Sequence, residues 1–287
     1  MTMLAVDLYS GIGGATLGLK AAGFEVCYAC ESDPVPADIY DKNMHPCERK
    51  KVQDIEPNKV PHVELVFASP PSQAELPAII GFVDKTNPRV IVLEFPVRLV
   101  NQEIVHSRTE LTFGNYRCWC GVLNASMFGL AQQKRIAYIV GRRSDVIVES
   151  NEFKFSNGEK KAGIKSIFEE TPDSKLLASP ERLARIQQTN ERNLKGGTGF
   201  QTKVYAGDEP VPALPVKYYK DYRNILVDSG TGPRRLSALE CKRLMGFPDG
   251  FEMKTSELQQ YRMLALASCP PVVEAIVKQA AAWTRCG

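Results

Sequence analysis

A short apolar segment, Leu4–Leu8, runs directly into a glycine-rich turn and then into a segment with a helical pattern. Few folds accommodate this unit, because glycine at positions 11, 13 and 14 lets the backbone approach a ligand where a Cβ atom would collide. The helix that follows offers free N–H groups and the positive end of its dipole. The stretch predicts a nucleotide-binding turn centred on Gly11, Gly13 and Gly14.

Two carboxylates are spaced as a nucleoside site requires. The next candidate strand, Phe24–Cys30, ends in Glu31, which is placed, as in dinucleotide-binding folds, to accept hydrogen bonds from ribose hydroxyls. Asp54 and Ile55 follow a third candidate strand, where the Asp54 carboxylate is placed to accept from an adenine amino group. We expect one ligand site. The alternative is three ordinary strand-end turns in an enzyme that binds nothing adenosyl.

From residue 1 to about residue 146, short β-branched strands alternate with amphipathic helices. This pattern is typical of an α/β fold with a mainly parallel sheet and helices on both faces. In such sheets ligands bind beyond the carboxyl ends of the strands. The remaining candidate strands are Val63–Ala68, Val90–Leu93 and Ile136–Val140, and the candidate helices are Pro77–Asp84 and Arg108–Phe113.

The composition changes at Ser144, after which a polar region predicts a second, smaller domain. The last helix, Pro270–Thr284, is apolar enough to pack back onto the first domain. We expect residues 1–146 plus 263–287 to form the large domain and residues 147–262 the small one. The small domain has candidate strands at Phe200–Tyr205 and Asn224–Val227, and a helix at Ser237–Met245 that begins with a capping box of Ser237 and Glu240.

Composition limits the class of protein. Hydrophobic residues make up 44% of the 287 residues, which is enough for a sizeable core. No apolar run approaches the roughly 18 residues of a membrane span. Met1 lies close before a core strand, which leaves no room for a signal peptide. We therefore expect an intracellular protein without membrane association, cytoplasmic if it comes from a bacterium, an archaeon or a phage.

Cysteine usage and charge are less specific. Eight cysteines in an intracellular chain of this size favour reduced thiols over a disulfide framework. Cys27 and Cys30 form a C-x-x-C pair, but no second pair or histidine stands at a ligand spacing, so we expect no metal. The formal net charge of +3 neither requires nor excludes a nucleic-acid partner.

Several motifs, in order along nearly the whole chain, resemble those of the DNA (cytosine-5) methyltransferase family. Asp7–Gly14 resembles its S-adenosylmethionine turn, and Ser69–Gln73 stands where the family has P-P-C-Q. Leu93–Pro96 stands at its E-N-V motif, and Asn124–Gly129 followed by Gln132 is similar to the approach to its Q-x-R-x-R segment. That segment aligns either without a gap, as Gln132–Ile136, or shifted by one residue, as Gln133–Arg135, which restores one arginine. The block Arg235–Pro248 is the closest match of all.

The resemblance implies a Rossmann-like, S-adenosylmethionine-dependent methyltransferase domain with a small target-recognition domain. The implied reaction moves a methyl group to C5 of a cytosine flipped out of DNA and leaves S-adenosylhomocysteine. A nucleophile at position 72 adds to C6, Glu94 shares a proton with the ring nitrogen, and a base removes the C5 hydrogen. The implied catalytic residues are Ser72, Glu94, Gln132, Lys134 and Arg135. The implied cofactor-binding residues are Tyr9, Ser10, Gly11, Gly13, Gly14, Glu31, Ser32, Asp54, Ile55 and Pro71.

Basic residues gather in or beside the expected small domain, where tyrosines interleave with them. This mixture suits contact with the phosphates of double-stranded DNA, although a solvated face and aromatic core packing are equally consistent with it. The region between Glu149 and Gly232 is short for target recognition, so help from a partner methyltransferase subunit is a further expectation. The candidate DNA-binding residues are Arg234, Arg235, Lys242, Arg243, Lys217 and Lys220.

Position 72 is serine where the family has its catalytic cysteine. A thiol with a pKa of about 8.5 supplies thiolate near neutrality, whereas an alcohol does not without a strong base. Three interpretations of Ser72 stay open: a laboratory replacement, a natural loss of activity, or a changed reaction on another nucleobase or a free nucleotide. Phe95, Ile136 and Ala265–Ala267 also depart from the family, and their joint departure favours natural divergence.

The sequence thus predicts a DNA cytosine-5 methyltransferase-like protein, of the kind found in restriction-modification systems, that Ser72 impairs as it stands. The alternative is a pseudoenzyme, meaning a catalytically silent cofactor- and DNA-binding partner of an active methyltransferase.

Overall fold

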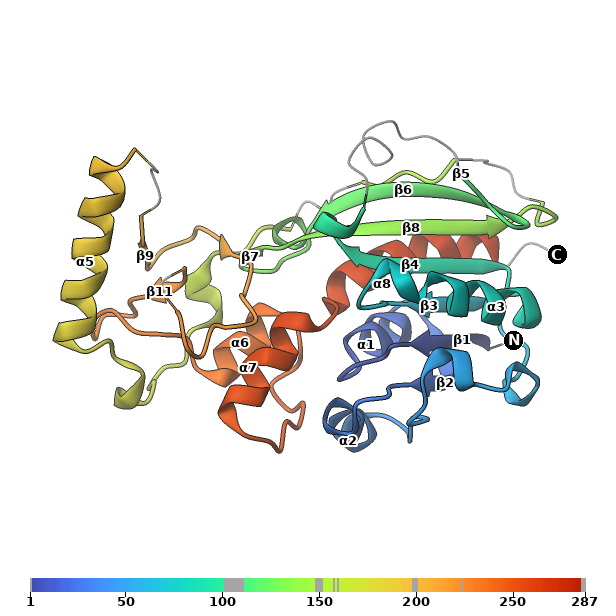
Figure 1. Cartoon of the computed structure of the whole chain (residues 1–287), viewed down its shortest axis with the longest axis horizontal. Coiled ribbons are helices and arrows are strands. Elements are labelled where there is room, and N and C mark those ends of the chain that lie inside the picture. The colour runs from blue at the N-terminus through green and yellow to red at the C-terminus, as the bar shows by residue number, and fades with distance from the viewer. Residues whose placement is uncertain are drawn as a thin grey trace.

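The computed structural model describes residues 2–100, 111–147, 152–156, 158, 160–197, 201–222 and 224–284. Within these ranges a central sheet has the strand order β2-β1-β3-β4-β8-β6-β5. Its strands, labelled as in Figure 1, are β1 (Met3–Leu8), β2 (Phe24–Cys30), β3 (Leu65–Ala68), β4 (Val90–Pro96), β5 (Leu111–Phe113), β6 (Tyr116–Asn124) and β8 (Arg135–Arg143).

Two further pairs of short parallel strands lie outside this sheet. They are β7 (Gln132–Gln133) with β10 (Val211–Pro212), and β9 (Val204–Tyr205) with β11 (Leu226–Val227). The described α-helices are α1 (Gly14–Ala21), α2 (Pro34–Asn43), α3 (Leu76–Thr86), α5 (Pro180–Lys195), α6 (Ala238–Leu244), α7 (Glu257–Leu266) and α8 (Pro270–Ala280). None of the described helices is both long and apolar enough to cross a bilayer.

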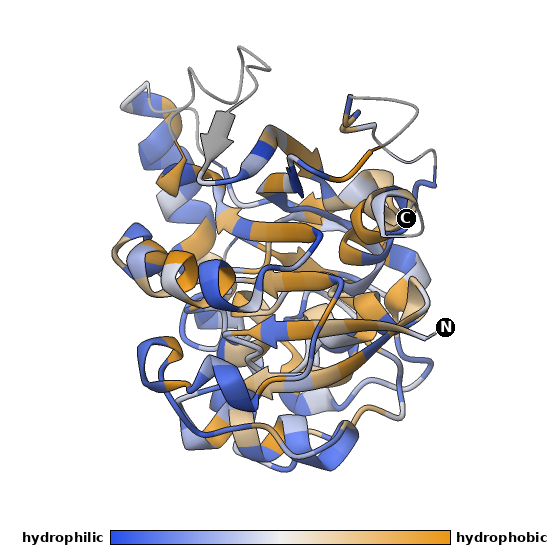
Figure 2. Ribbon diagram, turned by 90° about the vertical axis from the view of Figure 1, so that its right-hand side faces the viewer, coloured by the Kyte–Doolittle hydropathy of each residue, from blue (hydrophilic) through white to orange (hydrophobic). Residues whose placement is uncertain are grey.

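The strands β2, β1, β3 and β4 run parallel, and β8, β6 and β5 continue the sheet in antiparallel pairs. Side chains of one sheet face pack against α1, α2 and α8, and those of the other face pack against α3. Figure 2 shows the apolar strands stacked between helices whose polar sides face outward. The predicted α/β fold with helices on both faces of a mainly parallel sheet is confirmed.

The carboxyl ends of the four parallel strands meet at one edge. Leu8, the last residue of β1, lies beside Cys30 of β2 and Ala68 of β3, and Ala68 lies beside Leu93 of β4. The segments that follow these strands therefore share one end of the sheet, as the sequence predicted.

Two secondary-structure predictions were wrong. The helix expected at Arg108–Phe113 is wrong where it can be checked, because Leu111–Phe113 form β5 (residues 108–110 lie outside the described ranges). No strand leads to Asp54, which ends the short 3-10 turn Val52–Asp54. Strand β6 was not predicted. A Cβ atom on its Gly121 would lie 2.2 Å from the Phe155 ring, so close packing requires the glycine.

The region beyond the sheet is built around α6 and a long polar helix. The capping box of Ser237 and Glu240 at the start of α6 is confirmed. Helix α5 was not predicted; its sequence is mostly polar and Ile186 is its one buried residue. Figure 1 places α5, β9 and β11 at the end of the molecule away from β5. The division at residues 146 and 263 stays a prediction.

Close packing between α1 and α8 fixes the segment after β1 against the sheet. A Cβ atom on Gly18 would lie 2.6 Å from Cβ of Val273 and 2.7 Å from the carbonyl oxygen of Pro270. A Cβ atom on Gly14 would lie 2.3 Å from the carbonyl oxygen of Ser268. Gly14 and Gly18 are therefore needed for the approach of two helices, in addition to any approach of a ligand.

We predict that Gly18→Ala lowers the free energy of unfolding by about 1–3 kcal/mol, because the added methyl group meets backbone and a β-branched side chain in α8. Gly81→Ala is the matched control. Gly81 also lies inside a helix, nothing lies within 4 Å of its Cβ position, and alanine there should stabilise α3 by up to about 1 kcal/mol. Urea denaturation of both variants checks this, and equal effects would contradict it.

Candidate functional site

The turn after β1 has the backbone of a ligand-binding loop. Gly11 and Gly13 have φ angles of 54° and 95°, and Tyr9 is also left-handed at 58°. The backbone N–H of Ser10 donates to the carbonyl of Cys30 at 3.0 Å, which fixes the turn to the end of β2. A Cβ atom on Gly11 would meet nothing within 4 Å, so the glycine is there for its φ angle and the space beside it is open.

Glu31 lies against this turn, where the sequence placed a ribose-binding carboxylate. Its carboxylate accepts from the N–H of Gly11 at 3.0 Å and from the N–H of Asp33 at 2.8 Å. Burial raises the pKa of the Glu31 carboxyl above its ordinary value, and the two backbone donors oppose that rise. The side chain is thus held rigidly at the carboxyl edge of the sheet.

The other expected cofactor residues differ in their exposure to solvent. Ser10 is buried and its hydroxyl donates to the carbonyl of Cys30 at 3.2 Å, whereas Ser32 and Pro71 are exposed. Ile55 is buried in the same cluster as Leu8 and Cys30. Asp54 is exposed at the end of its 3-10 turn, so its proposed contact with adenine stays a prediction.

Ser72 lies just after β3 at the expected nucleophile position. It precedes a short 3-10 turn, Gln73–Glu75, which leads directly into α3. The turn is pinned, because the Tyr9 hydroxyl donates to Glu75 at 3.0 Å and the Gln73 amide donates to the carbonyl of Leu99. Among the described residues, no side chain hydrogen-bonds the Ser72 hydroxyl. His62, the histidine nearest in sequence, precedes β3 and so lies toward the other end of that strand.

Glu94, on the neighbouring strand β4, is only 5% exposed. Its Oε2 accepts from the Tyr138 hydroxyl at 2.7 Å and its Oε1 accepts from the Ser268 hydroxyl at 2.9 Å. Burial raises the pKa of the Glu94 carboxyl, and the two hydroxyl donors oppose the rise. Sequence reasoning missed Tyr138 and Ser268 as partners, because they come from β8 and from the segment before α8, far away in the chain.

The Q-x-R-x-R-like segment is tied to the protein rather than open to a ligand. Lys134 Nζ donates to the carbonyls of Ala265 and Ala267, at 3.2 and 2.8 Å, and so holds the segment that carries Ser268. Gln132 is fully buried, and its Nε2 donates to the carbonyl of Leu244 at 2.8 Å. The expected catalytic contact of Gln132 is therefore corrected to a structural one. Arg135 is exposed at the start of β8.

Asp7 is a site residue that the motif comparison did not single out. It is fully buried at the end of β1, where its Oδ2 accepts from the Thr16 hydroxyl at 2.7 Å. That hydroxyl also lies 2.9 Å from the Tyr40 hydroxyl. Within the described residues Asp7 Oδ1 has no hydrogen-bond partner. Burial raises the pKa of Asp7 to about 7, and the nearby Glu94 and Glu31 carboxylates add to the rise. The signal for Asp7 in the sequence is a charged residue within an otherwise apolar strand.

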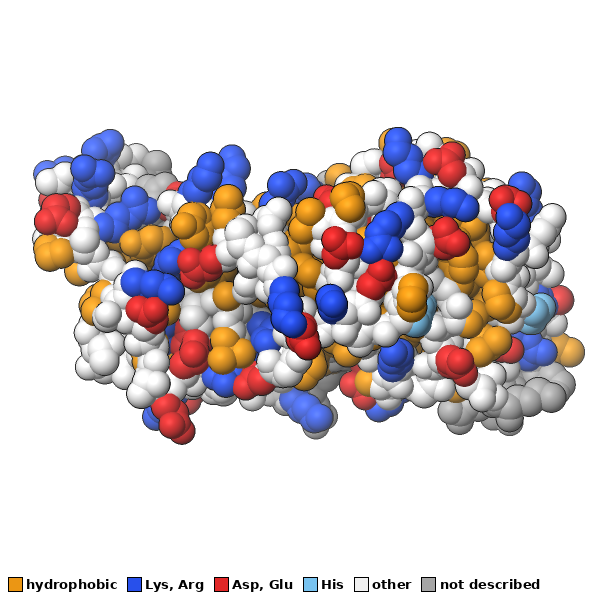
Figure 3. Space-filling model, turned by 90° about the horizontal axis from the view of Figure 1, so that it is seen from below, with side chains coloured by type: hydrophobic (Ala, Val, Ile, Leu, Met, Phe, Trp, Pro, Cys, Tyr) orange, Lys and Arg blue, Asp and Glu red, His pale blue; other side chains and the backbone are white. Residues whose placement is uncertain are grey.

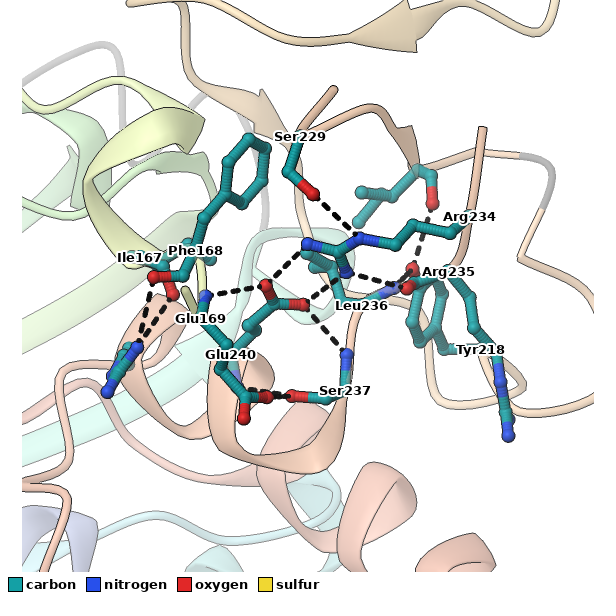
Figure 4. Close-up of polar contacts among 12 residues, drawn as sticks. Ile167, Phe168, Glu169, Tyr218, Ser229, Arg234, Arg235, Leu236, Ser237 and Glu240 are labelled. Atoms are coloured by element: carbon teal, nitrogen blue, oxygen red, sulfur yellow. Dashed lines mark hydrogen bonds and ion pairs between the residues drawn. The ribbon is translucent and has the colours of Figure 1, made fainter. Parts of the chain in front are cut away.

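The structure corrects the expectation that Arg234 contacts DNA. Its side chain is 1% exposed, and its guanidinium makes two 2.7 Å hydrogen bonds to the Glu240 carboxylate (Figure 4). The guanidinium also donates to Ser229 and to the carbonyl of Arg235. Glu240 in turn accepts from the backbone N–H groups of Ser237 and Glu169. This buried pair anchors the start of α6.

The other candidate DNA-binding residues differ in whether their charged groups are already paired within the protein. Lys242 donates to the carbonyls of Asp249 and Phe251, and Arg243 pairs with Asp249, so neither head group is free. Arg235 pairs with Glu257 at 3.2 Å and lies over the Tyr219 ring. Lys217 and Lys220 are exposed. In Figure 3 Lys and Arg atoms are interspersed with acidic ones and are most frequent toward the end where α5 lies.

The described cysteines are free thiols, with Cys27 half-buried and Cys30 buried. In the described part of the chain, no three His, Cys, Asp or Glu side chains converge in a way that could hold a metal ion.

Comparisons with known proteins agree with this geometry. The family model of the C-5 cytosine-specific DNA methylases matches residues 3–74 and 76–282. The chain is 26% identical to the Type II methyltransferase M.NlaX of Neisseria lactamica, over 96% of this chain and 95% of that one. It is 23% identical to M.HhaI of Haemophilus parahaemolyticus, over 90% of this chain and 88% of that one.

Solved structures share the fold. A mutant of Spodoptera frugiperda DNMT2 superimposes with a TM-score of 0.75 at 17% identity, covering 97% of this chain and 99% of that one. The S. pombe Dnmt2 methyltransferase gives a TM-score of 0.72 at 18% identity, covering 98% of each chain. On the strength of the family match, the chain belongs to the C-5 cytosine-specific DNA methylase family.

Proposed function

We propose that the chain binds S-adenosylmethionine at the turn after β1 and double-stranded DNA beyond the carboxyl edge of the sheet, and that Ser72 prevents methyl transfer to cytosine C5 as the chain stands. One contrast carries the proposal. In the cofactor half of the site Glu31 is fixed on the backbone of Gly11, whereas no described side chain hydrogen-bonds the Ser72 hydroxyl.

The residues at the turn suit the cofactor. Both Glu31 oxygens keep lone pairs that could accept from ribose hydroxyls, and the open space at Gly11 admits a ligand that a Cβ atom would obstruct. The N-terminus of α1 adds its dipole to the turn. When bound, S-adenosylmethionine supplies an electrophilic methyl group, and transfer would leave S-adenosylhomocysteine. Contacts with Tyr9, Ser10, Gly13, Ser32, Asp54, Ile55 and Pro71 belong to the same proposal.

Position 72 lacks a side chain suited to the covalent step. Cytosine C5 becomes nucleophilic only after a nucleophile has added to C6, and an alcohol does this poorly because its oxygen keeps its proton near neutral pH. Glu94 would assist by sharing a proton with the ring nitrogen. In this structure each Glu94 oxygen accepts one hydrogen bond, from Tyr138 or from Ser268, and these two hydroxyls hold the carboxylate in place.

The same observation favours a second candidate function, a catalytically silent partner of an active methyltransferase. Glu94 is bonded to two hydroxyls, Lys134 to two carbonyls and Gln132 to the end of α6. Three polar groups at the expected base site thus have partners within the protein itself, which suits a structural role. Restoring the thiol separates the two candidates.

Contact with DNA rests on the exposed cations beyond the sheet edge. Lys217 and Lys220 are exposed and could meet phosphates, whereas Arg234 is too deeply buried to do so. The bacterial sources of the curated relatives support an intracellular setting for such a protein.

We predict that Ser72→Cys restores transfer of tritiated methyl from S-adenosylmethionine to a mixed-sequence duplex, while the unaltered chain stays at background. The physical reason is that a thiolate is available near neutral pH and an alkoxide is not. Free nucleotides serve as the control substrate. Transfer by neither chain would support the silent partner, and transfer by the unaltered chain would contradict the proposed block.

We predict that Glu31→Ala weakens binding of S-adenosylmethionine by about tenfold to a hundredfold, because buried charge-assisted hydrogen bonds contribute about 1.5–3 kcal/mol each. Titration calorimetry on the folded variant measures this. The control is Glu25→Ala, which removes an exposed carboxylate from the start of β2. An affinity unchanged by the loss of Glu31 would place the ribose elsewhere.

We predict different consequences for removing two cations of the expected small domain, one buried and one exposed. Arg234→Met should lower the free energy of unfolding by about 3–5 kcal/mol, because it leaves the Glu240 charge buried and unpaired. Lys217→Ala should leave stability unchanged, but weaken duplex binding and reduce its salt dependence, because one phosphate contact is lost. Urea denaturation and fluorescence anisotropy at several salt concentrations measure the two effects. Loss of stability in Lys217→Ala would contradict this assignment.

A further inference from the structure

A chain of hydrogen bonds leads from the buried carboxyl group of Asp7 to the imidazole of His45. Asp7 Oδ2 accepts from the Thr16 hydroxyl at 2.7 Å, and the Thr16 oxygen lies 2.9 Å from the Tyr40 hydroxyl. The Tyr40 hydroxyl in turn lies 3.4 Å from Nε2 of His45. Asp7, Thr16 and Tyr40 are each 0% exposed, whereas His45 is partly exposed. Solvent therefore reaches this chain at His45.

The four side chains come from elements that pack together beneath the turn after β1. Asp7 lies in β1, Thr16 in α1 and Tyr40 in α2, and His45 follows α2 by two residues. The Tyr40 ring packs against the turn itself, since a Cβ atom on Gly13 would lie 3.1 Å from Tyr40 Cδ2. The hydrogen bonds thus connect the end of β1 and the turn with the surface beyond α2.

The chain can be fully hydrogen-bonded in two ways. Nδ1 of His45 lies 3.0 Å from the carbonyl oxygen of Pro46, which can only accept, so Nδ1 carries a proton in both. In the first arrangement Asp7 is ionised and each hydroxyl donates toward it, so Nε2–H of a positively charged His45 must donate to Tyr40. In the second, Asp7 is protonated, each hydroxyl donates the opposite way, and Nε2 of a neutral His45 accepts from Tyr40.

The two arrangements contain the same number of protons and differ by one proton shift at each link. The Nε2–H bond of His45 breaks as an O–H bond forms on Tyr40. The original Tyr40 proton moves to the Thr16 oxygen, and the original Thr16 proton moves to Asp7 Oδ2. One positive and one negative charge are neutralised. Burial raises the pKa of the Tyr40 hydroxyl, so this group gives up a proton only as it gains another.

The titratable groups around the buried part of the chain are acids. They are Glu94, Glu31 and Cys30 toward Asp7, and Cys47 and Asp41 toward Tyr40. Burial, with a smaller contribution from the neighbouring carboxylates, raises the pKa of the Asp7 carboxyl to about 7. Asp7 therefore gains and loses its proton close to neutral pH, where histidine commonly acts as a proton shuttle.

We infer that Thr16, Tyr40 and His45 form a proton relay that carries protons between solvent and the buried carboxyl group of Asp7. The relay keeps β1 bonded to α1 in both arrangements, because Thr16 is hydrogen-bonded to Asp7 whether that carboxyl is ionised or protonated. It also lets Asp7 change its charge beneath the turn without opening of the fold. The relay needs no bound cofactor, so the inference does not depend on the proposed function.

The test is time-resolved infrared spectroscopy of the protonated carboxyl band of Asp7 after a laser flash releases protons from a caged acid. The measurement starts at about pH 8, where most of Asp7 is ionised, and Asp7→Asn identifies the band. We expect Tyr40→Phe and His45→Gln to slow protonation of Asp7 at least about tenfold, because the proton must then wait for local opening of the fold. Tyr28→Phe, the control, removes a hydroxyl of β2 outside the chain and should keep the unaltered rate.

Each outcome decides for or against the relay. If either Tyr40→Phe or His45→Gln gains the proton at the rate of the unaltered chain, the inference is wrong. It is also wrong if Tyr28→Phe slows protonation to the same extent, or if the unaltered chain shows no Asp7 band. Circular dichroism establishes that each variant is folded. If Tyr40→Phe does not fold, the result for the partly exposed His45 decides alone.

Discussion

The parallel pairing of β2, β1, β3 and β4 is the constraint on which the rest of the site depends. It brings the carboxyl ends of four strands to one edge, so that the residues following them become neighbours although they are far apart in the chain. Tyr9, Glu31 and Ser72 follow three of these strands, and Glu94 lies near the carboxyl end of the fourth. A shift of one strand by a single residue would turn Asp7 or Glu94 to the other face of the sheet.

A series of contacts also connects this edge of the sheet to the start of α1. Lys134 holds the segment before Ser268, the Ser268 hydroxyl donates to Glu94, and the Ser268 carbonyl packs against Gly14 at the start of α1. The position of Glu94 is thus coupled to the packing of the turn that is proposed to bind the cofactor. Burial of Asp7 raises the pKa of its carboxyl to about 7, so the folded state loses stability as the pH rises from the ordinary range of an aspartate toward 7. Perturbed carboxyl groups of this kind are common at functional sites.

Much of this arrangement could be predicted from sequence because its signals are local. The strand–turn–helix unit, the position of Glu31 after β2 and the capping box of Ser237 and Glu240 each depend on a few consecutive residues. The partners of Glu94 could not be predicted, since Tyr138 and Ser268 reach it only through the tertiary fold. Positive charge in the sequence did not identify the DNA-binding residues either, because Arg234, a candidate phosphate contact, is buried against Glu240.

We propose that this cofactor-binding scaffold lacks the covalent step because position 72 is serine. The most direct test is intact mass spectrometry of the unaltered chain after incubation with S-adenosylmethionine and a duplex that carries 5-fluorocytosine at many sequence positions. Fluorine at C5 cannot be removed as a proton, so any covalent complex that completes methyl transfer is trapped. We expect only the mass of the free chain, with Ser72→Cys as the comparison that can form the complex. A protein–DNA adduct at Ser72 of the unaltered chain would contradict it.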